Sequence, residues 1–138
     1  MRGIVFPYRA LHRQILAAAM GVAVISLYLM LMGNPTYAGE IIVASYEGVI
    51  NPVAAEYLHD ALALAHSSGA QALIFKLDTP GGLDTSMRLM IKEMTSSPLP
   101  VIVFVAPSGG RAASAGVFIT MAAHVAAMAP GTNIGAAH

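Results

Sequence analysis

The chain has 138 residues, enough for one domain, and only 10% of them are charged, where soluble domains average about 25%. The formal net charge is zero, and the seven basic residues form no cluster outside the N-terminus, which excludes an electrostatic footprint for nucleic acid. Cysteine is absent, so disulfides, thiolate zinc sites and a cysteine nucleophile are excluded as well.

An uncharged apolar run at residues 15–32 follows three arginines and precedes Gly33-Asn34-Pro35, which breaks a helix. The small residues Thr36 and Ala38 then fit a signal-peptidase site. The run is also close to the roughly 20 residues of a spanning helix, and the arginines favour a cytoplasmic N-terminus. We therefore predict that residues 1–38 are a signal peptide or N-terminal membrane anchor, with the rest on the periplasmic or extracytoplasmic side. A buried core helix is the alternative.

From residue 39 onward, strand and helix signals alternate. The predicted strands are residues 40–46, 72–77, 101–106 and 125–128. One predicted helix begins at Asn51-Pro52, a second begins at Asp84, and a third covers residues 112–122. This repeat of βα units predicts an α/β fold with mostly parallel strands. The unbroken apolar strand at 101–106 is typical of a strand covered on both faces. The tail at 130–138 looks like a loop with no closing helix, which predicts an incomplete fold.

Two of the predicted helices have recognisable starts and apolar faces. Asn51 and Asp84 are candidate N-caps. The expected buried face of the first helix consists of Val53, Tyr57, Ala61, Leu64 and Ala65, and that of the second of Leu83, Met87, Met90, Ile91 and Met94.

Each of two strands is followed by a turn rich in glycine. Asp78-Thr79-Pro80-Gly81-Gly82 can aim backbone N–H groups at a ligand beyond the carboxyl end of its strand. Residues 107–116 place Ser114 among small neighbours near the start of a helix, where unpaired N–H groups favour an oxyanion. Either segment alone could be an ordinary turn or a packed helix contact. Together they provide what acyl transfer needs, a nucleophile and two donors around one carbonyl oxygen.

The ordered motifs DTPGGL, PVIVFVAPSGGRAASAG and AAMAPGTNIGAAH resemble the N-terminal protease domain of NfeD-type membrane serine proteases, which belong to the ClpP class beside the signal peptide peptidase SppA. The resemblance covers residues 40–138 and implies a ClpP/crotonase fold without cofactor or metal. It implies a Ser–Lys endopeptidase that cleaves hydrophobic segments of membrane proteins, works with a stomatin-like partner and forms a homo-oligomer. Ser114 takes the nucleophile position, and Gly81 or Gly82, with the N–H of Ala115, takes the oxyanion-hole positions.

The general base is the missing part of this site. Lys76 and Lys92 are the only lysines and both precede Ser114, whereas the base of the family follows the nucleophile. We therefore expect the chain to be truncated before its lysine and to be inactive alone. His138 is a possible alternative base, because its separation from Ser114 is similar to that of the Ser–His pair in ClpP.

The other polar residues have blander expected roles. His124 is expected to be a cap or surface group, and His59 and His66 to lie on the solvated side of the first helix without metal-binding spacing. Asp78 is expected to orient a loop by accepting backbone N–H groups, and Arg111 to contact substrate or a neighbouring subunit.

Two alternative functions remain open. A non-catalytic scaffold or pseudoenzyme could bind hydrophobic segments with the same surface. A crotonase-like acyl-CoA enzyme would share the glycine-turn oxyanion hole, although an export signal argues against a cytosolic acyl-CoA substrate.

Overall fold

The computed structural model describes residues 18–28 and 39–137. The chain divides into two compact units, Met1–Tyr37 and Ala38–His138. In the first unit, residues 18–28 are helical and their apolar side chains are exposed. Within the two described ranges, every helix is too short or too polar to cross a lipid bilayer. Most of the predicted signal or anchor at 1–38 lies outside the described residues.

The second unit is built on four parallel strands. They are β1 (Ile41–Glu47), β2 (Ala72–Asp78), β3 (Val101–Val105) and β5 (Val125–Met128), in the spatial order β1-β2-β3-β5. The predicted strands and their parallel arrangement are confirmed, with bounds that differ by at most one residue. Because all four strands run the same way, the turns that follow β2 and β3 reach the same edge of the sheet.

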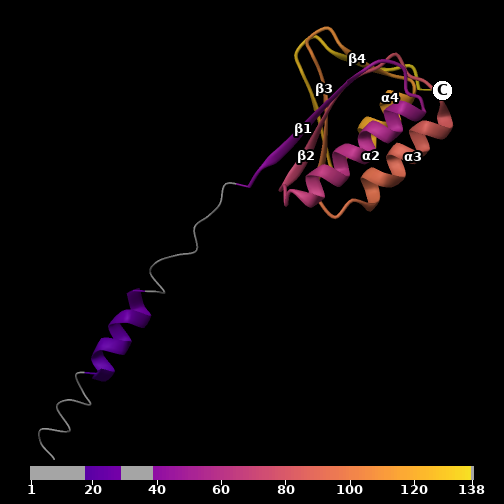
Figure 1. The fold of residues 1–138 in the computed structure, drawn as a ribbon. Helices are drawn as coiled ribbons and strands as arrows, with labels where there is room; N and C mark the ends of the chain where they lie inside the picture. The colour runs from indigo at the N-terminus through magenta and orange to yellow at the C-terminus, as the bar shows by residue number, and fades with distance from the viewer. Residues whose placement is uncertain (1–17, 29–38, 138) are drawn as a thin grey trace, which may run out of the picture. The chain divides into compact units, whose positions relative to one another are not determined.

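Three helices pack on one face of this sheet (Figure 1). They are α2 (Pro52–Ser67), α3 (Asp84–Ser96) and α4 (Ala115–Met121). Val101, Val103 and Val105 of β3 are fully buried, whereas Ile102 and Phe104 on the other side of the strand are only half-buried. The prediction that both faces of β3 are covered is therefore wrong, because all the helices described after residue 39 share one core.

Helix α2 begins as the sequence predicted but buries a different stripe. The side chain of Asn51 accepts a hydrogen bond from the N–H of Ala54 at 2.9 Å, which caps the helix. Val53 and Leu64, however, are 67% and 56% exposed. The buried stripe consists of Ala54, Leu58, Ala61 and Ala65. Apolar residues lie around much of this helix, so packing against the sheet and α3, not periodicity, selects the inner face.

Helix α3 differs from the prediction at its start. Leu83 occupies the N-cap position, makes no side-chain capping bond and is 53% exposed. Asp84 lies in the first turn and accepts a hydrogen bond from Arg88 at 2.8 Å, which raises the pKa of the guanidinium. The predicted Asp84 cap and buried Leu83 are therefore wrong. Met87, Met90 and Met94 are buried as predicted, with Ile91 half-buried against them.

The last third of the chain contains two short strands that the sequence did not indicate. Ala112 and Ala113, predicted as the beginning of a helix, lie in β4 (Arg111–Ala113), and the predicted loop contains β6 (Asn133–Gly135). The two strands pair in parallel, with Arg111 opposite Asn133. This pairing leaves Ser114 between β4 and α4.

Candidate active site

The turn after β2 lies against the segment that carries Ser114. A Cβ built on Gly81 would lie 2.8 Å from the Cβ of Ser114, and Gly81 has φ +110°, which favours glycine. A Cβ on Gly82 would overlap the backbone of Ile50. The structure therefore brings together the two glycine-bearing turns, as the sequence predicted, and their contact leaves no space for larger residues.

Ser114 has a backbone conformation that is rare for a residue with a side chain. Its φ is 51° and its ψ is −112°, at a sharp turn from β4 into α4. Its N–H donates to the carbonyl of Gly135 at 2.9 Å, and its own carbonyl accepts from Val117 at 3.0 Å. The side chain is exposed. Strained strand-to-helix turns of this kind present nucleophiles, and strain held by surrounding bonds is a common mark of functional sites.

The N–H groups around Ser114 are not equivalent. The N–H of Gly81 donates to the hydroxyl of Thr79 at 3.0 Å. Within residues 39–137, no hydrogen bond engages the N–H of Gly82 or of Ala115. Ala115 is the first residue of α4, where N–H groups have no partner inside the helix. Of the two glycines that the sequence offered as donors, Gly82 is thus the one whose N–H is available to a ligand.

The candidate bases do not join this cluster. Lys76 lies inside β2 between Ser45 and Phe104 of the neighbouring strands, and Lys92 is exposed on α3. His138 lies outside the described residues. Among residues 39–137, no lysine or histidine side chain forms a hydrogen bond with Ser114.

The remaining predicted polar residues have structural roles, Asp78 and Arg111 at this edge and His124 at the opposite edge, where β3 begins. Asp78 accepts a hydrogen bond from the backbone N–H of Arg111 at 2.9 Å, which confirms its expected role in orienting a loop. Arg111 lines a polar pocket of about 470 Å³ together with Glu47, Asp78 and Asn133. His124 is exposed and its Nδ1 accepts the N–H of Val101, so it holds the start of β3.

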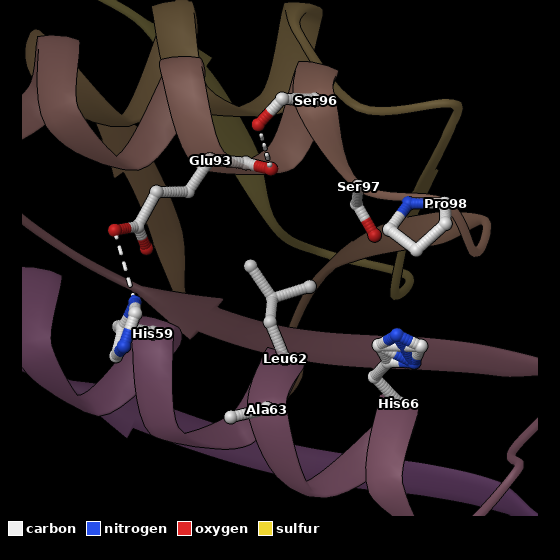
Figure 2. Close-up of a pocket in the computed structure, with 8 residues that line it drawn as sticks. All are labelled: His59, Leu62, Ala63, His66, Glu93, Ser96, Ser97 and Pro98. Atoms are coloured by element: carbon white, nitrogen blue, oxygen red, sulfur yellow. Dashed lines mark hydrogen bonds and ion pairs between the residues drawn. The ribbon is translucent and has the colours of Figure 1, made fainter.

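A separate pocket of about 300 Å³ lies between α2 and α3 (Figure 2). His59 and Glu93 line this pocket and contact each other, with 3.1 Å between Nδ1 of His59 and Oε1 of Glu93. His66 lies farther along α2 and faces Ser97 and Pro98. Both histidines are exposed, as predicted. Across the described part of the chain, no three histidine or carboxylate side chains are grouped to hold a metal ion. Because α2 and α3 run back from the carboxyl edge, the ends that form this pocket lie toward the opposite edge of the sheet.

The chain is similar in sequence to a known family and to two longer proteins. Residues 41–138 match the family model described as NfeD1b, N-terminal domain. A membrane-bound protease of Pyrococcus horikoshii is 38% identical over 111 residues, which are 80% of this chain and 25% of that protein. The membrane protein NfeD1b of Bacillus subtilis is 32% identical over 121 residues, 88% of this chain and 27% of that protein. The chain thus spans about a quarter of the length of these relatives.

Solved structures of similar proteins have the same fold as this chain. A membrane protease from Pyrococcus horikoshii that is specific for a stomatin homolog is 40% identical, with a TM-score of 0.67 over 70% of this chain and 48% of that one. A stomatin-specific protease mutant in complex with a substrate peptide is 37% identical, with a TM-score of 0.72 over 74% of this chain and 47% of that one. ClpP1 of Listeria monocytogenes, at 24% identity and a TM-score of 0.52, covers 59% of this chain and 46% of its own, and shows the fold alone. The predicted ClpP-like α/β fold is confirmed.

Proposed function

The chain belongs to the NfeD1b N-terminal domain family, and we propose on that basis that it carries the nucleophile of a membrane-associated serine endopeptidase. The observation that carries this proposal is the strained Ser114 beside two N–H groups that have no hydrogen-bond partner among residues 39–137. The Ser114 oxygen attacks a peptide carbonyl carbon while its proton passes to a base. The resulting oxyanion accepts hydrogen bonds from Gly82 and Ala115, the arrangement that stabilises tetrahedral intermediates.

The base in this proposal is a lysine. Solved structures of the stomatin-specific protease include a serine-to-alanine and a lysine-to-alanine mutant, the pair that a Ser–Lys dyad presents. Lys76 and Lys92 are the only lysines in the sequence, and neither lies beside Ser114. The lysine would therefore come from polypeptide other than these 138 residues, with His138 as the second candidate for the base.

The proposed substrate is a hydrophobic segment of a membrane protein, and the proposed partner is a stomatin-like protein. Support comes from the relatives that are named stomatin-specific. Further support comes from exposed apolar side chains next to both turns, Leu83 after Gly82 and Phe118 one helical turn after Ser114. Phe118 also lines a pocket of about 700 Å³, whose wall combines apolar Met87 and Ile91 with charged Asp84, Arg88 and Lys92.

We further propose that the N-terminal 38 residues are a signal or anchor that places the protease domain on the extracytoplasmic side of a membrane, as a homo-oligomer. The three arginines before an uncharged apolar run support this topology. The names of both curated relatives include the word membrane.

The test is covalent labelling of the full chain by a fluorophosphonate with ethylamine added, because the 138 residues place no lysine beside Ser114. The Ser114 oxygen forms a bond to phosphorus, fluoride leaves, and the hydroxyl proton passes to the amine. We expect intact mass and peptide mapping to place the adduct on Ser114, with none on the Ser114→Ala chain. Ser108→Ala, an exposed serine of the same segment, is the matched control and should label like the parent. Labelling that is absent, or that persists in Ser114→Ala, would overturn the proposal.

The identity of the missing base can be tested in the same assay. At constant pH, we expect ethylamine to accelerate labelling of Ser114, because it substitutes for a lysine side chain. A rate that does not depend on amine concentration would contradict the lysine part of the proposal.

A non-catalytic scaffold is the second candidate, and the absence of a base beside Ser114 in residues 39–137 favours it. Under that function, hydrophobic peptide binding survives in Ser114→Ala and the fluorophosphonate leaves the parent unlabelled.

A further inference from the structure

Thr79 is a fully buried polar residue that contacts both halves of the candidate site. It lies directly after β2, and its exposed fraction is 0%. Buried hydroxyl groups need hydrogen-bond partners, and those of Thr79 belong to the turn that precedes the oxyanion-hole donor.

The hydroxyl of Thr79 forms two hydrogen bonds with the backbone of Gly81. It accepts the N–H of Gly81 at 3.0 Å and donates to the carbonyl of the same residue at 3.2 Å. The N–H of Ile50 also donates to that carbonyl at 2.8 Å. The carbonyl of Gly81 and the N–H of Gly82 belong to one peptide plane and point in opposite directions across it. Fixing the carbonyl toward Thr79 and Ile50 therefore aims the N–H of Gly82 away from them.

The backbone of Thr79 holds the nucleophile segment. Its N–H donates to the carbonyl of Arg111 at 2.7 Å, and its carbonyl accepts the N–H of Ala113 at 3.0 Å. Its methyl group fills the space beside Gly116, where an added Cβ would lie 2.6 Å away. One residue thus bonds to the strand that precedes Ser114 and contacts the first turn of the helix that follows it.

We propose that Thr79 is a positioning residue of the oxyanion hole. Its hydroxyl engages the N–H of Gly81 and leaves the N–H of Gly82 as the donor, while its backbone sets the distance between that donor and Ser114. This inference rests on the proposed function, because it assigns how the same site is aligned.

The test compares Thr79→Val with Thr79→Ser in the full chain. Valine keeps the branched shape and the methyl contact with Gly116 but removes the hydroxyl, whereas serine keeps the hydroxyl and removes the methyl group. We expect fluorophosphonate labelling of Ser114 to slow about tenfold to a hundredfold in the valine variant, short of the loss of a whole oxyanion donor, and to stay near the parent rate in the serine variant. Amide exchange at Gly81, measured by NMR, should accelerate in the valine variant only.

The outcomes separate this inference from the proposed function. A labelled parent with an equally labelled Thr79→Val chain overturns the role of Thr79 alone. Equal slowing in both variants also overturns it, since the hydroxyl would then not be the cause. If the parent itself is not labelled, the proposed function fails and this inference fails with it. If the valine variant does not fold, the serine variant decides. Fast amide exchange at Gly81 or slow labelling of Ser114 in Thr79→Ser then overturns the inference.

Discussion

Two regions place polar groups beside a hollow, but they are built differently. One is the carboxyl edge of the sheet, and the other is the pocket of about 300 Å³ between α2 and α3, called the groove from here on. At the edge, the reactive geometry is made by backbone: Ser114 at positive φ, and the N–H groups of Gly82 and Ala115, which nothing in the described residues 39–137 engages. In the groove, the polar groups are the side chains of His59 and Glu93 on two regular helices. Glu93 Oε2 is buried there without a hydrogen-bond partner in residues 39–137.

Because of this difference, the two regions should respond differently to substitution. A site made by backbone is damaged by adding atoms or by moving a turn, because its donors have no side chain to adjust. The pair of His59 and Glu93 is partly exposed, at 64% and 35%, so water can replace much of what the removal of His59 takes away, and the effect should be small. Mutations at the edge should therefore change both the labelling rate of Ser114 and the stability, whereas mutations in the groove should change the stability slightly and the labelling rate not at all.

The largest effect is expected from Gly82→Ala. The added methyl group would overlap the backbone of Ile50, so the turn must move and the Gly82 donor moves with it. We expect labelling of Ser114 to fall by about a hundredfold or more, together with a loss of about 1–3 kcal/mol or more in the free energy of unfolding. Labelling kinetics and chemical denaturation measure the two effects.

Gly135→Ala is the matched control, since an added Cβ there meets open space while its carbonyl still accepts the N–H of Ser114. It should leave the labelling rate within a factor of about two of the parent, less than a 1 kcal/mol change in barrier. Similar losses in the two variants would mean that the edge is sensitive to glycine replacement in general and not to the Gly82 donor.

An intermediate effect is expected at Asp78. Its carboxylate accepts the N–H of Arg111, which begins the strand that leads to Ser114. Asp78→Ala should lose about 1–2 kcal/mol of stability and slow labelling severalfold, because β4 loses a bond to β2. Asp78→Asn retains an oxygen acceptor and should recover most of both. If neither the stability nor the labelling rate recovers in Asp78→Asn, the edge requires the negative charge near Arg111 and not the hydrogen bond to its backbone.

The sequence predicted local features of the edge and missed those that depend on distant pairing. Strand β5 and the placement of Ser114 at a helix start follow from short apolar runs and small-residue neighbours. The pairing of β4 with β6 joins segments of only three residues, too short to show an alternating pattern. The inner stripe of α2 was misassigned for a related reason, since its exposed Val53 and Leu64 are as apolar as its buried Leu58. Which N–H stays free, Gly81 or Gly82, depends on the Thr79 hydroxyl and could not be read from the motif.

The smallest effect is expected in the groove, where His59→Ala removes one partner of the pair with Glu93. The side chain of His59 is 64% exposed, and pairs of this kind contribute at most about 1 kcal/mol. We expect a change in unfolding free energy of about that size or less and no change in the labelling rate of Ser114. Glu93→Gln, which keeps an oxygen acceptor for His59, should be closer still to the parent in both measurements.

These small effects are what make the comparison between the two regions falsifiable. A labelling rate that fell severalfold in His59→Ala, with the stability unchanged, would mean that the groove between α2 and α3 is coupled to Ser114. Helix α3 offers a route for such coupling, because it contacts both α2 and α4 and begins directly after the Gly82 turn. If the carboxyl edge alone governs the reactivity of Ser114, no such coupling exists. His59→Ala therefore tests whether the two regions are independent, and it does so with little disturbance to the fold.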